Sequence, residues 1–167
     1  GRAVRVAPDG RFLVGFGRDA KVKTKVLALT SDGHTLACPV VIAKRTYQVQ
    51  RIDGLPKRQV TPDPVAIARI KKDNAAIGRV RRLDTASTDF AAPFIWPVKG
   101  RISGIFGSQR ILNGKPRSPH NGVDIAAPKG TPIVAPAPGV VALVHPDMFY
   151  TGKSVMLDHG HGLSSVY

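Results

Sequence analysis

The chain has 167 residues, enough for one ordinary domain or two small ones. Its 43% hydrophobic and 22% charged residues argue against a disordered chain or a membrane protein. The net charge of +14 comes from 25 Lys and Arg against 11 acidic residues, all of which are Asp. This balance favours polyanionic partners such as nucleic acid, anionic lipid or an acidic wall polymer.

The positive charge is spread along the chain. Residues 1–60 carry 12 basic and 4 acidic residues, and residues 93–167 carry 7 and 3. Nucleic-acid binding needs a basic stripe, a known module or an aromatic stacking platform, but the aromatic residues make up 6% and are scattered. We therefore predict no nucleic-acid partner. No apolar run reaches the roughly 18 residues of a membrane helix, so we also predict no transmembrane segment. The single Cys38 excludes an intrachain disulfide.

Residues 1–57 predict a small antiparallel β module. Asp9-Gly10 is a turn signal between two short apolar runs. Residues 21–29 are predicted to alternate, with Lys21, Lys23 and Lys25 facing one way and Val22 and Val26 the other. Short strands at regular spacing are typical of a small sandwich, although about 55 residues are few for a stable domain. The predicted strands lie at residues 3–6, 12–16, 21–29, 39–43 and 46–52.

Residues 58–92 predict a helix and a linker. Thr61-Pro62-Asp63-Pro64 offers capping oxygens and an early proline, which favour a helix start. Three isoleucines then follow at helical spacing among basic residues, so one amphipathic helix is predicted within residues 61–83. Its basic residues indicate a solvated face or, alternatively, a face that contacts the cell wall or a membrane. Residues 84–93 are rich in Ala, Ser and Thr and predict a linker.

Residues 93–167 predict an all-β domain that is dense in Gly and Pro. The predicted strands lie at residues 101–106, 122–126, 131–135, 139–145 and 153–158. The predicted fold class is therefore mainly β: an N-terminal antiparallel β module, a connecting helix and a C-terminal β-sheet domain.

His120 and Asp124 are the residues with the clearest chemical potential. Imidazole and carboxylate are both good zinc ligands, and zinc takes a tetrahedral set of donors at roughly 2 Å. Pro119 and Pro128 argue against a helix here, and in a straight strand residues four apart lie about 13 Å from each other. One metal can bind both side chains only if the chain bends, which Gly122 permits. The spacing alone is a weak signal.

The surrounding sequence closely resembles the lysostaphin- and LytM-like M23 family of zinc metallopeptidases. The resemblance covers about residues 94–167 and is most specific in the His-x-Gly-x-Asp element at 120–124, which is followed by Gly130-Thr131-Pro132 and Ala135. It continues through residues 106–110, 139–141 and 152–163.

This resemblance implies a zinc-dependent endopeptidase that hydrolyses peptide bonds in bacterial peptidoglycan with a zinc-activated water. It implies that His120 and Asp124 bind Zn²⁺, that peptidoglycan peptides are the partners, and that the protein acts in the periplasm or cell envelope or is secreted. The family's third ligand and its catalytic histidines fall in segments expected beyond Tyr167, so the catalytic residues remain unassigned. The chain alone is then expected not to cleave peptidoglycan, and the missing C-terminal segment is expected as a continuation or a separate chain. The alternative is a non-catalytic wall-binding or regulatory protein of M23-like fold.

The other histidines are predicted to lie outside the metal site. His159-Gly160-His161 spells His-x-His, but it matches a glycine-rich turn that precedes the family's true motif, so it predicts a hairpin corner with solvated or structural histidines. His145 is predicted to be a surface residue at a strand end, and His34 a turn residue.

Overall fold

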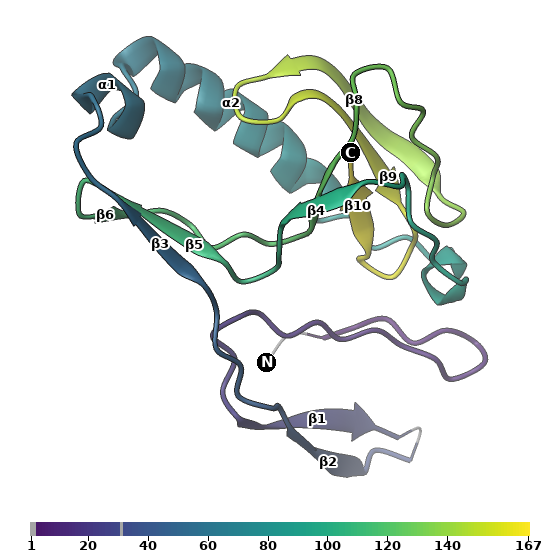
Figure 1. Ribbon diagram of the computed structural model, residues 1–167. Helices are drawn as coiled ribbons and strands as arrows, with labels where there is room; N and C mark the ends of the chain where they lie inside the picture. Colours follow the sequence, from purple (N-terminus) through teal and green to yellow (C-terminus); the bar gives the residue numbers. More distant parts are fainter. Residues whose placement is uncertain (1–2, 31) are drawn as a thin grey trace. The chain divides into compact units, whose positions relative to one another are not determined.

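The computed structural model describes residues 3–30 and 32–167; residues 1, 2 and 31 of the predicted N-terminal module lie outside the described residues (Figure 1). The described chain is mainly β with one long helix, which confirms the predicted fold class. Its helices are α1 (Lys57–Val60), α2 (Pro64–Val80) and the 3₁₀ turn η1 (Asp89–Ala91). Its strands are β1 (Lys23–Leu29), β2 (Thr35–Val41), β3 (Val49–Ile52), β4 (Arg101–Gly104), β5 (Gln109–Leu112), β6 (Lys115–Pro116), β7 (Asp124–Ala126), β8 (Val140–Met148), β9 (Gly152–Asp158) and β10 (Ser164–Val166).

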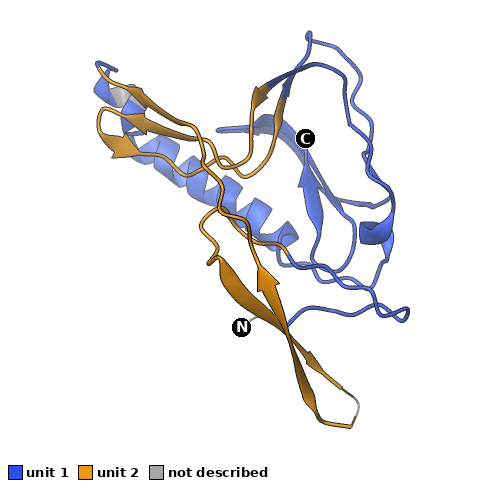
Figure 2. Ribbon diagram, turned by 60° about the horizontal axis from the view of Figure 1, so that its bottom comes forward, with its two compact units in different colours: residues 1–14, 54–102, 125–167 blue, residues 15–53, 103–124 orange. Residues whose placement is uncertain are grey.

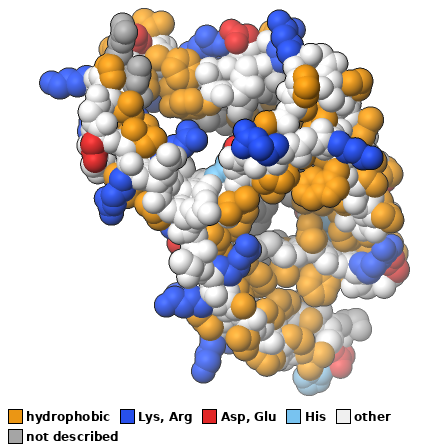
Figure 3. All heavy atoms as spheres, in the orientation of Figure 1, with side chains coloured by type: hydrophobic (Ala, Val, Ile, Leu, Met, Phe, Trp, Pro, Cys, Tyr) orange, Lys and Arg blue, Asp and Glu red, His pale blue; other side chains and the backbone are white. Residues whose placement is uncertain are grey.

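The chain divides into two compact units that interleave in sequence. Unit 1 comprises residues 1–14, 54–102 and 125–167, and unit 2 comprises residues 15–53 and 103–124 (Figure 2). Each unit thus combines segments from both ends of the chain. The domain boundaries at residues 57 and 92 stay a prediction. Basic side chains are dispersed over the visible surface rather than gathered in one patch (Figure 3).

Helix α2 of unit 1 begins where the local sequence predicts. Asp63 is extended and its Oδ1 accepts a hydrogen bond of 2.7 Å from the Ala66 amide, while Pro64 occupies the first turn. An Asp cap satisfies one of the amide groups left free at a helix start, and proline there loses no hydrogen bond. The helix start is therefore determined by residues 63–66 alone.

The buried residues of unit 1 gather around the antiparallel sheet β10-β9-β8. Met148, Met156 and Leu157 are buried apolar residues of this sheet, and His159 follows β9 with no exposed surface. Helix α2 contacts β8 in the same unit. Asp73 of α2 is buried, and its Oδ2 accepts a 2.8 Å hydrogen bond from the Phe149 amide, just after β8.

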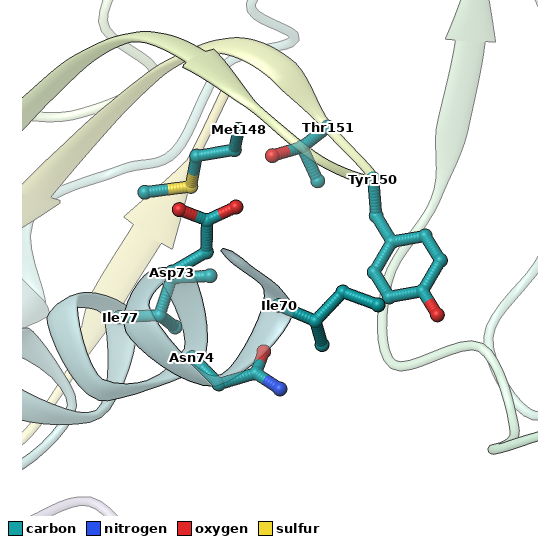
Figure 4. Close-up of a pocket in the computed structure, with 7 residues that line it drawn as sticks. All are labelled: Ile70, Asp73, Asn74, Ile77, Met148, Tyr150 and Thr151. Carbon is teal, nitrogen blue, oxygen red and sulfur yellow. The ribbon is translucent and has the colours of Figure 1, made fainter. Parts of the chain in front are cut away.

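A cavity of about 160 Å³ lies between α2 and the β8–β9 hairpin (Figure 4). Its walls are mostly apolar, with the Asp73 carboxylate beside Met148. Two of the three isoleucines that predicted the apolar helix face line it, whereas Ile67 is 40% exposed. The lining residues are Ile70, Asp73, Asn74, Ile77, Met148, Tyr150 and Thr151.

The segment predicted as a linker is held by hydrogen bonds inside unit 1. Thr85 Oγ1 donates to Asp158 Oδ2 at 2.7 Å, and the Thr85 carbonyl accepts from the His161 amide at 2.9 Å. Asp84 pairs with Arg5 at 3.1 Å, and Phe90 stacks on His161 with ring centroids 4.3 Å apart. Residues 84–92 are thus anchored to the turn that follows β9.

Unit 2 contains a hairpin and a mixed sheet. Strands β1 and β2 pair antiparallel, as expected for the N-terminal module, but β3 pairs in parallel with β5, so the expected purely antiparallel sandwich is wrong for this strand. β5 and β6 form a hairpin around Asn113 and Gly114, whose φ angles are 47° and 74°. Positive φ at both central positions is typical of a type I′ turn and favours Asn-Gly. Among the described residues of unit 2, Gly107 alone is buried.

Most of the predicted strands, but not all, are present in the structure. Those at 21–29, 39–43, 46–52, 101–106, 122–126, 139–145 and 153–158 correspond, with shifted ends, to β1, β2, β3, β4, β7, β8 and β9. The hairpin of residues 3–6 and 12–16 reduces to one bridge between Val6 and Phe12. The strand predicted at 131–135 is wrong, because these residues have irregular backbone. β5, β6 and β10 were not predicted; their short lengths give little periodicity to recognise.

Candidate metal centre

The backbone of unit 2 places His120 through two hydrogen bonds to the segment 105–108. The His120 amide donates to the Ser108 carbonyl, and the Gly107 amide donates to the His120 carbonyl, both at 2.8 Å. On the side chain, Nδ1 lies 3.2 Å from the Ile105 carbonyl oxygen. Because a carbonyl only accepts, Nδ1 carries the proton, and Nε2 of the neutral ring keeps its lone pair for a metal.

Glycine at position 104 makes room for Asp124. Asp124 opens β7, which pairs with β4, and β4 ends at Gly104. A Cβ at position 104 would lie only 2.4 Å from Asp124 Oδ2 and 3.0 Å from its Cγ. Any other residue would therefore push the carboxylate away. Gly104 and the Ile105 carbonyl were missed at the sequence level, although a glycine inside a strand is a known sign of a close approach.

The two predicted ligands converge. His120 Nε2 lies 3.1 Å from Asp124 Oδ1, within the distance expected for two donors of one zinc ion. With Nδ1 committed to a carbonyl, the Nε2 lone pair faces an anionic oxygen. An imidazole nitrogen and a carboxylate oxygen at this separation are a donor pair that fits a metal.

Gly122 forms a bend between the two side chains, as the spacing requires. Its φ is not in the positive range, and a Cβ there would meet no atom within 4 Å. The bend therefore follows from the pairing of the flanking residues rather than from the freedom of glycine.

His159 and His161 are buried structural residues rather than solvated ones. His159 is fully buried; its Nδ1 lies 2.5 Å from the Pro138 carbonyl oxygen and its Nε2 2.7 Å from Ser165 Oγ. His161 Nδ1 lies 3.2 Å from the Arg5 carbonyl oxygen. These bonds occupy both nitrogens of His159. That neither histidine binds metal stays a prediction.

The remaining two histidines differ in exposure. His34 is an exposed residue beside the Asp32-Gly33 turn, as predicted. His145 was predicted to be a surface residue, but its side chain is only 29% exposed. Its Nδ1 accepts from the Asp147 amide at 3.1 Å, and its Nε2 lies 3.9 Å from Asp73 Oδ1, so α2 covers part of the ring.

Within residues 3–30 and 32–167, no group of three or more His, Cys, Asp or Glu side chains is arranged to hold a metal ion. Among the described residues, His120 and Asp124 are the two predicted ligands, and their Nε2 and Oδ1 atoms lie 3.1 Å apart.

Comparison with protein families finds a match in the C-terminal part of the chain. Residues 118–167, which include the predicted ligands His120 and Asp124, match the model of peptidase family M23. The C-terminal segment of this chain is thus similar to peptidase family M23. The resemblance seen in the sequence is thereby confirmed.

Two curated relatives are similar to part of this chain. An "uncharacterized metalloprotease" of Haemophilus influenzae is 39% identical over 71 residues, which cover 41% of this chain and 15% of the relative. The peptidoglycan DD-endopeptidase ShyA of Vibrio cholerae is 39% identical over 72 residues, which cover 41% of this chain and 16% of ShyA. The matched stretch is thus less than a sixth of each relative.

The similarity to a solved structure extends over nearly the whole chain. A crystal structure assigned to peptidase M23, from Pseudomonas aeruginosa, has a TM-score of 0.69 and 27% identity. It aligns with 98% of this chain, which covers 60% of that structure. Residues 15–53 of unit 2 therefore lie within the part of the chain that aligns with this structure.

Proposed function

We propose that this chain is part of a zinc-dependent endopeptidase that hydrolyses peptide bonds in peptidoglycan, with His120 and Asp124 as two of the zinc ligands. The observation that carries the proposal is the 3.1 Å separation of His120 Nε2 and Asp124 Oδ1 within an M23 segment. The relative named as a peptidoglycan DD-endopeptidase supports the choice of substrate. It also supports action in the periplasm or cell envelope. No described helix is long and apolar enough to cross a membrane.

Two neighbouring residues of this chain position the proposed zinc ligands. The Ile105 carbonyl holds the His120 ring in the tautomer that directs the Nε2 lone pair at the metal position. Gly104 leaves the space in which the Asp124 carboxylate lies. When bound, zinc supplies Lewis-acid polarisation of the scissile carbonyl and activates the attacking water.

The side chains are open to a substrate. His120 is 32% exposed and Asp124 is 64% exposed, so a peptide can reach the pair without an opening movement of unit 2. A catalytic zinc usually has three protein ligands, and the third is expected to be a further histidine, as the family resemblance implies.

Metal analysis tests the two ligands directly. The full-length protein should bind one zinc per molecule, and His120→Ala and Asp124→Asn should each lower its zinc affinity by about 10-fold or more, because each removes one of few donors. His34→Ala is the matched control, since His34 is exposed and lies outside the site. The measurement is zinc content after dialysis, with digestion of purified sacculi in parallel.

Retention of zinc by both variants would refute the ligand assignment. Zinc binding without digestion of sacculi would favour the alternative, a wall-binding or regulatory protein of the same fold.

A further inference from the structure

The segment 105–108, which positions His120, also contacts the ring of Tyr47. The segment 105–108 bonds to His120 on one side, as described above, and Tyr47 packs on the same segment. A Cβ at Gly107 would lie 2.1 Å from Tyr47 Cδ1, so the ring rests directly on this glycine, whose φ is 85°. Phe106 meets the same ring edge-on at 6.2 Å between centroids. Tyr47 is therefore positioned by the segment that also positions the proposed zinc ligand.

Two arginines contact the Tyr47 ring. The guanidinium carbons of Arg18 and Arg45 lie 5.1 and 5.5 Å from its centroid, within cation–π range. Two positive groups on one ring repel each other, and this arrangement becomes more favourable when an anion joins them. The cluster of Arg18, Arg45 and Tyr47 lies entirely in unit 2.

The arginines have unused hydrogen-bonding capacity. Arg18 Nη1 donates to Gln109 Oε1 at 3.1 Å, but its Nε is buried and has no hydrogen-bond partner among the described residues. The nearby Asp19 carboxylate lies 3.7 Å from Nε and is 86% exposed, so it neutralises little of the charge. Arg45 is exposed, and in the described chain no carboxylate pairs with it.

We propose that Arg18 and Arg45, held against Tyr47, bind a carboxylate group of the peptide substrate whose scissile bond lies at the His120–Asp124 pair. This inference rests on the proposed function, since it identifies the ligand as a peptide. A planar guanidinium matches a carboxylate with two parallel hydrogen bonds. Unit 2 carries ten Lys and Arg against four Asp, so the surrounding potential also favours an anionic ligand.

Such a subsite selects among peptide bonds. A substrate is held at its carboxylate by the arginines while the scissile bond lies at the His120–Asp124 pair. Peptides with a free carboxylate then bind more tightly than the same peptides with that group amidated, because an amide has no charge and offers one acceptor oxygen instead of two.

The test compares cross-linked muropeptide dimers with the same dimers after chemical amidation of their carboxylates. Binding to the metal-free full-length protein is measured by calorimetry, and hydrolysis of both ligands is measured with the zinc-loaded protein. We expect the wild type to bind the carboxylate form about 10-fold more tightly, and Arg45→Gln to reduce this preference to about 2-fold or less, given the usual strength of a charge-assisted hydrogen bond.

Arg51→Gln is the matched control, because Arg51 is an exposed arginine of β3 in the same unit and the substitution removes the same charge. It should keep the full preference. Arg45 is exposed, so its variant should fold normally; Arg18→Gln is compared only if its circular dichroism spectrum matches the wild type.

Equal binding of both ligand forms by the wild type, or an unchanged preference in Arg45→Gln, would overturn the inference. So would an equal loss in Arg51→Gln, which would indicate a general charge effect. A protein that hydrolyses neither form but binds the carboxylate form through Arg45 would support the subsite and refute the proposed peptidase activity.

Discussion

At the scale of single residues, the candidate metal centre depends on the absence of a side chain at Gly104. Two ligands four positions apart meet at 3.1 Å because the carboxylate of Asp124 lies against the bare Cα of Gly104. Neighbouring groups that orient a ligand commonly affect metal affinity as strongly as some ligands do. Gly104 therefore belongs to the site although it offers no donor atom of its own.

Substitution Gly104→Ala tests this role. The new Cβ would lie 2.4 Å from Asp124 Oδ2 and should displace the carboxylate, which should weaken zinc binding by about 10- to 100-fold. The measurement is a competition titration with a zinc chelator. Gly15→Ala serves as the control, since a Cβ at Gly15 would meet no atom within 4 Å. Unchanged zinc affinity in Gly104→Ala would show that the carboxylate can move aside and still bind.

At the scale of elements, α2 is attached to the β8–β9 hairpin by one buried and one exposed contact. Asp73 is 6% exposed and accepts the Phe149 amide, whereas the Arg69–Asp147 pair, at 2.7 Å, is 43% and 75% exposed. An exposed ion pair contributes little, whereas the hydrogen bond between Asp73 and the Phe149 amide is partly buried, so leaving that amide without an acceptor is more costly. The buried contact is therefore expected to dominate the docking of the helix.

Asp73→Ala should lower the free energy of unfolding by about 1–3 kcal/mol, because it leaves the Phe149 amide without a partner. Asp73→Asn keeps an acceptor oxygen and should lose clearly less, whereas Asp147→Ala should lose less than about 1 kcal/mol. Urea titration followed by circular dichroism gives all three values. A larger loss for Asp147→Ala than for Asp73→Ala would reverse this ranking of the two contacts.

At the scale of the whole molecule, the buried side chains are distributed unequally. The buried apolar residues of the described chain belong to unit 1, together with His159 and His161. The β1–β2 hairpin of unit 2 exposes large apolar side chains, among them Leu27 at 56% and Leu29 at 77%. An isolated two-stranded hairpin is marginally stable, so local opening should begin there.

Limited proteolysis tests both this order and the predicted domain boundaries. We expect an unspecific protease to cut first near residues 32–34, between β1 and β2, and to spare residues 84–92, which are hydrogen-bonded to the turn after β9. Mass spectrometry of early fragments gives the order. Early cleavage within 84–92 would instead support a boundary at residue 92, as predicted from the Ala-, Ser- and Thr-rich composition.

The sequence by itself determined those features whose cause lies within a few residues. Asp63 and Pro64 start α2, and the His-x-Gly-x-Asp element indicates the M23-like segment. In each case the relevant backbone conformation or chemistry depends on neighbours in the chain. Such signals can be read without knowledge of the rest of the fold.

The tertiary structure alone decided which distant segments meet. The parallel pairing of β3 with β5 brings residues 49–52 beside residues 109–112 and separates the strands of the predicted N-terminal module. The tertiary structure also buries His159 and His161, although their glycine-rich turn is compatible with solvated side chains. It also places Gly104 against Asp124. Strand pairing and close packing depend on both of the segments that meet. The hydrophobic periodicity of one segment therefore does not predict which other segment it contacts.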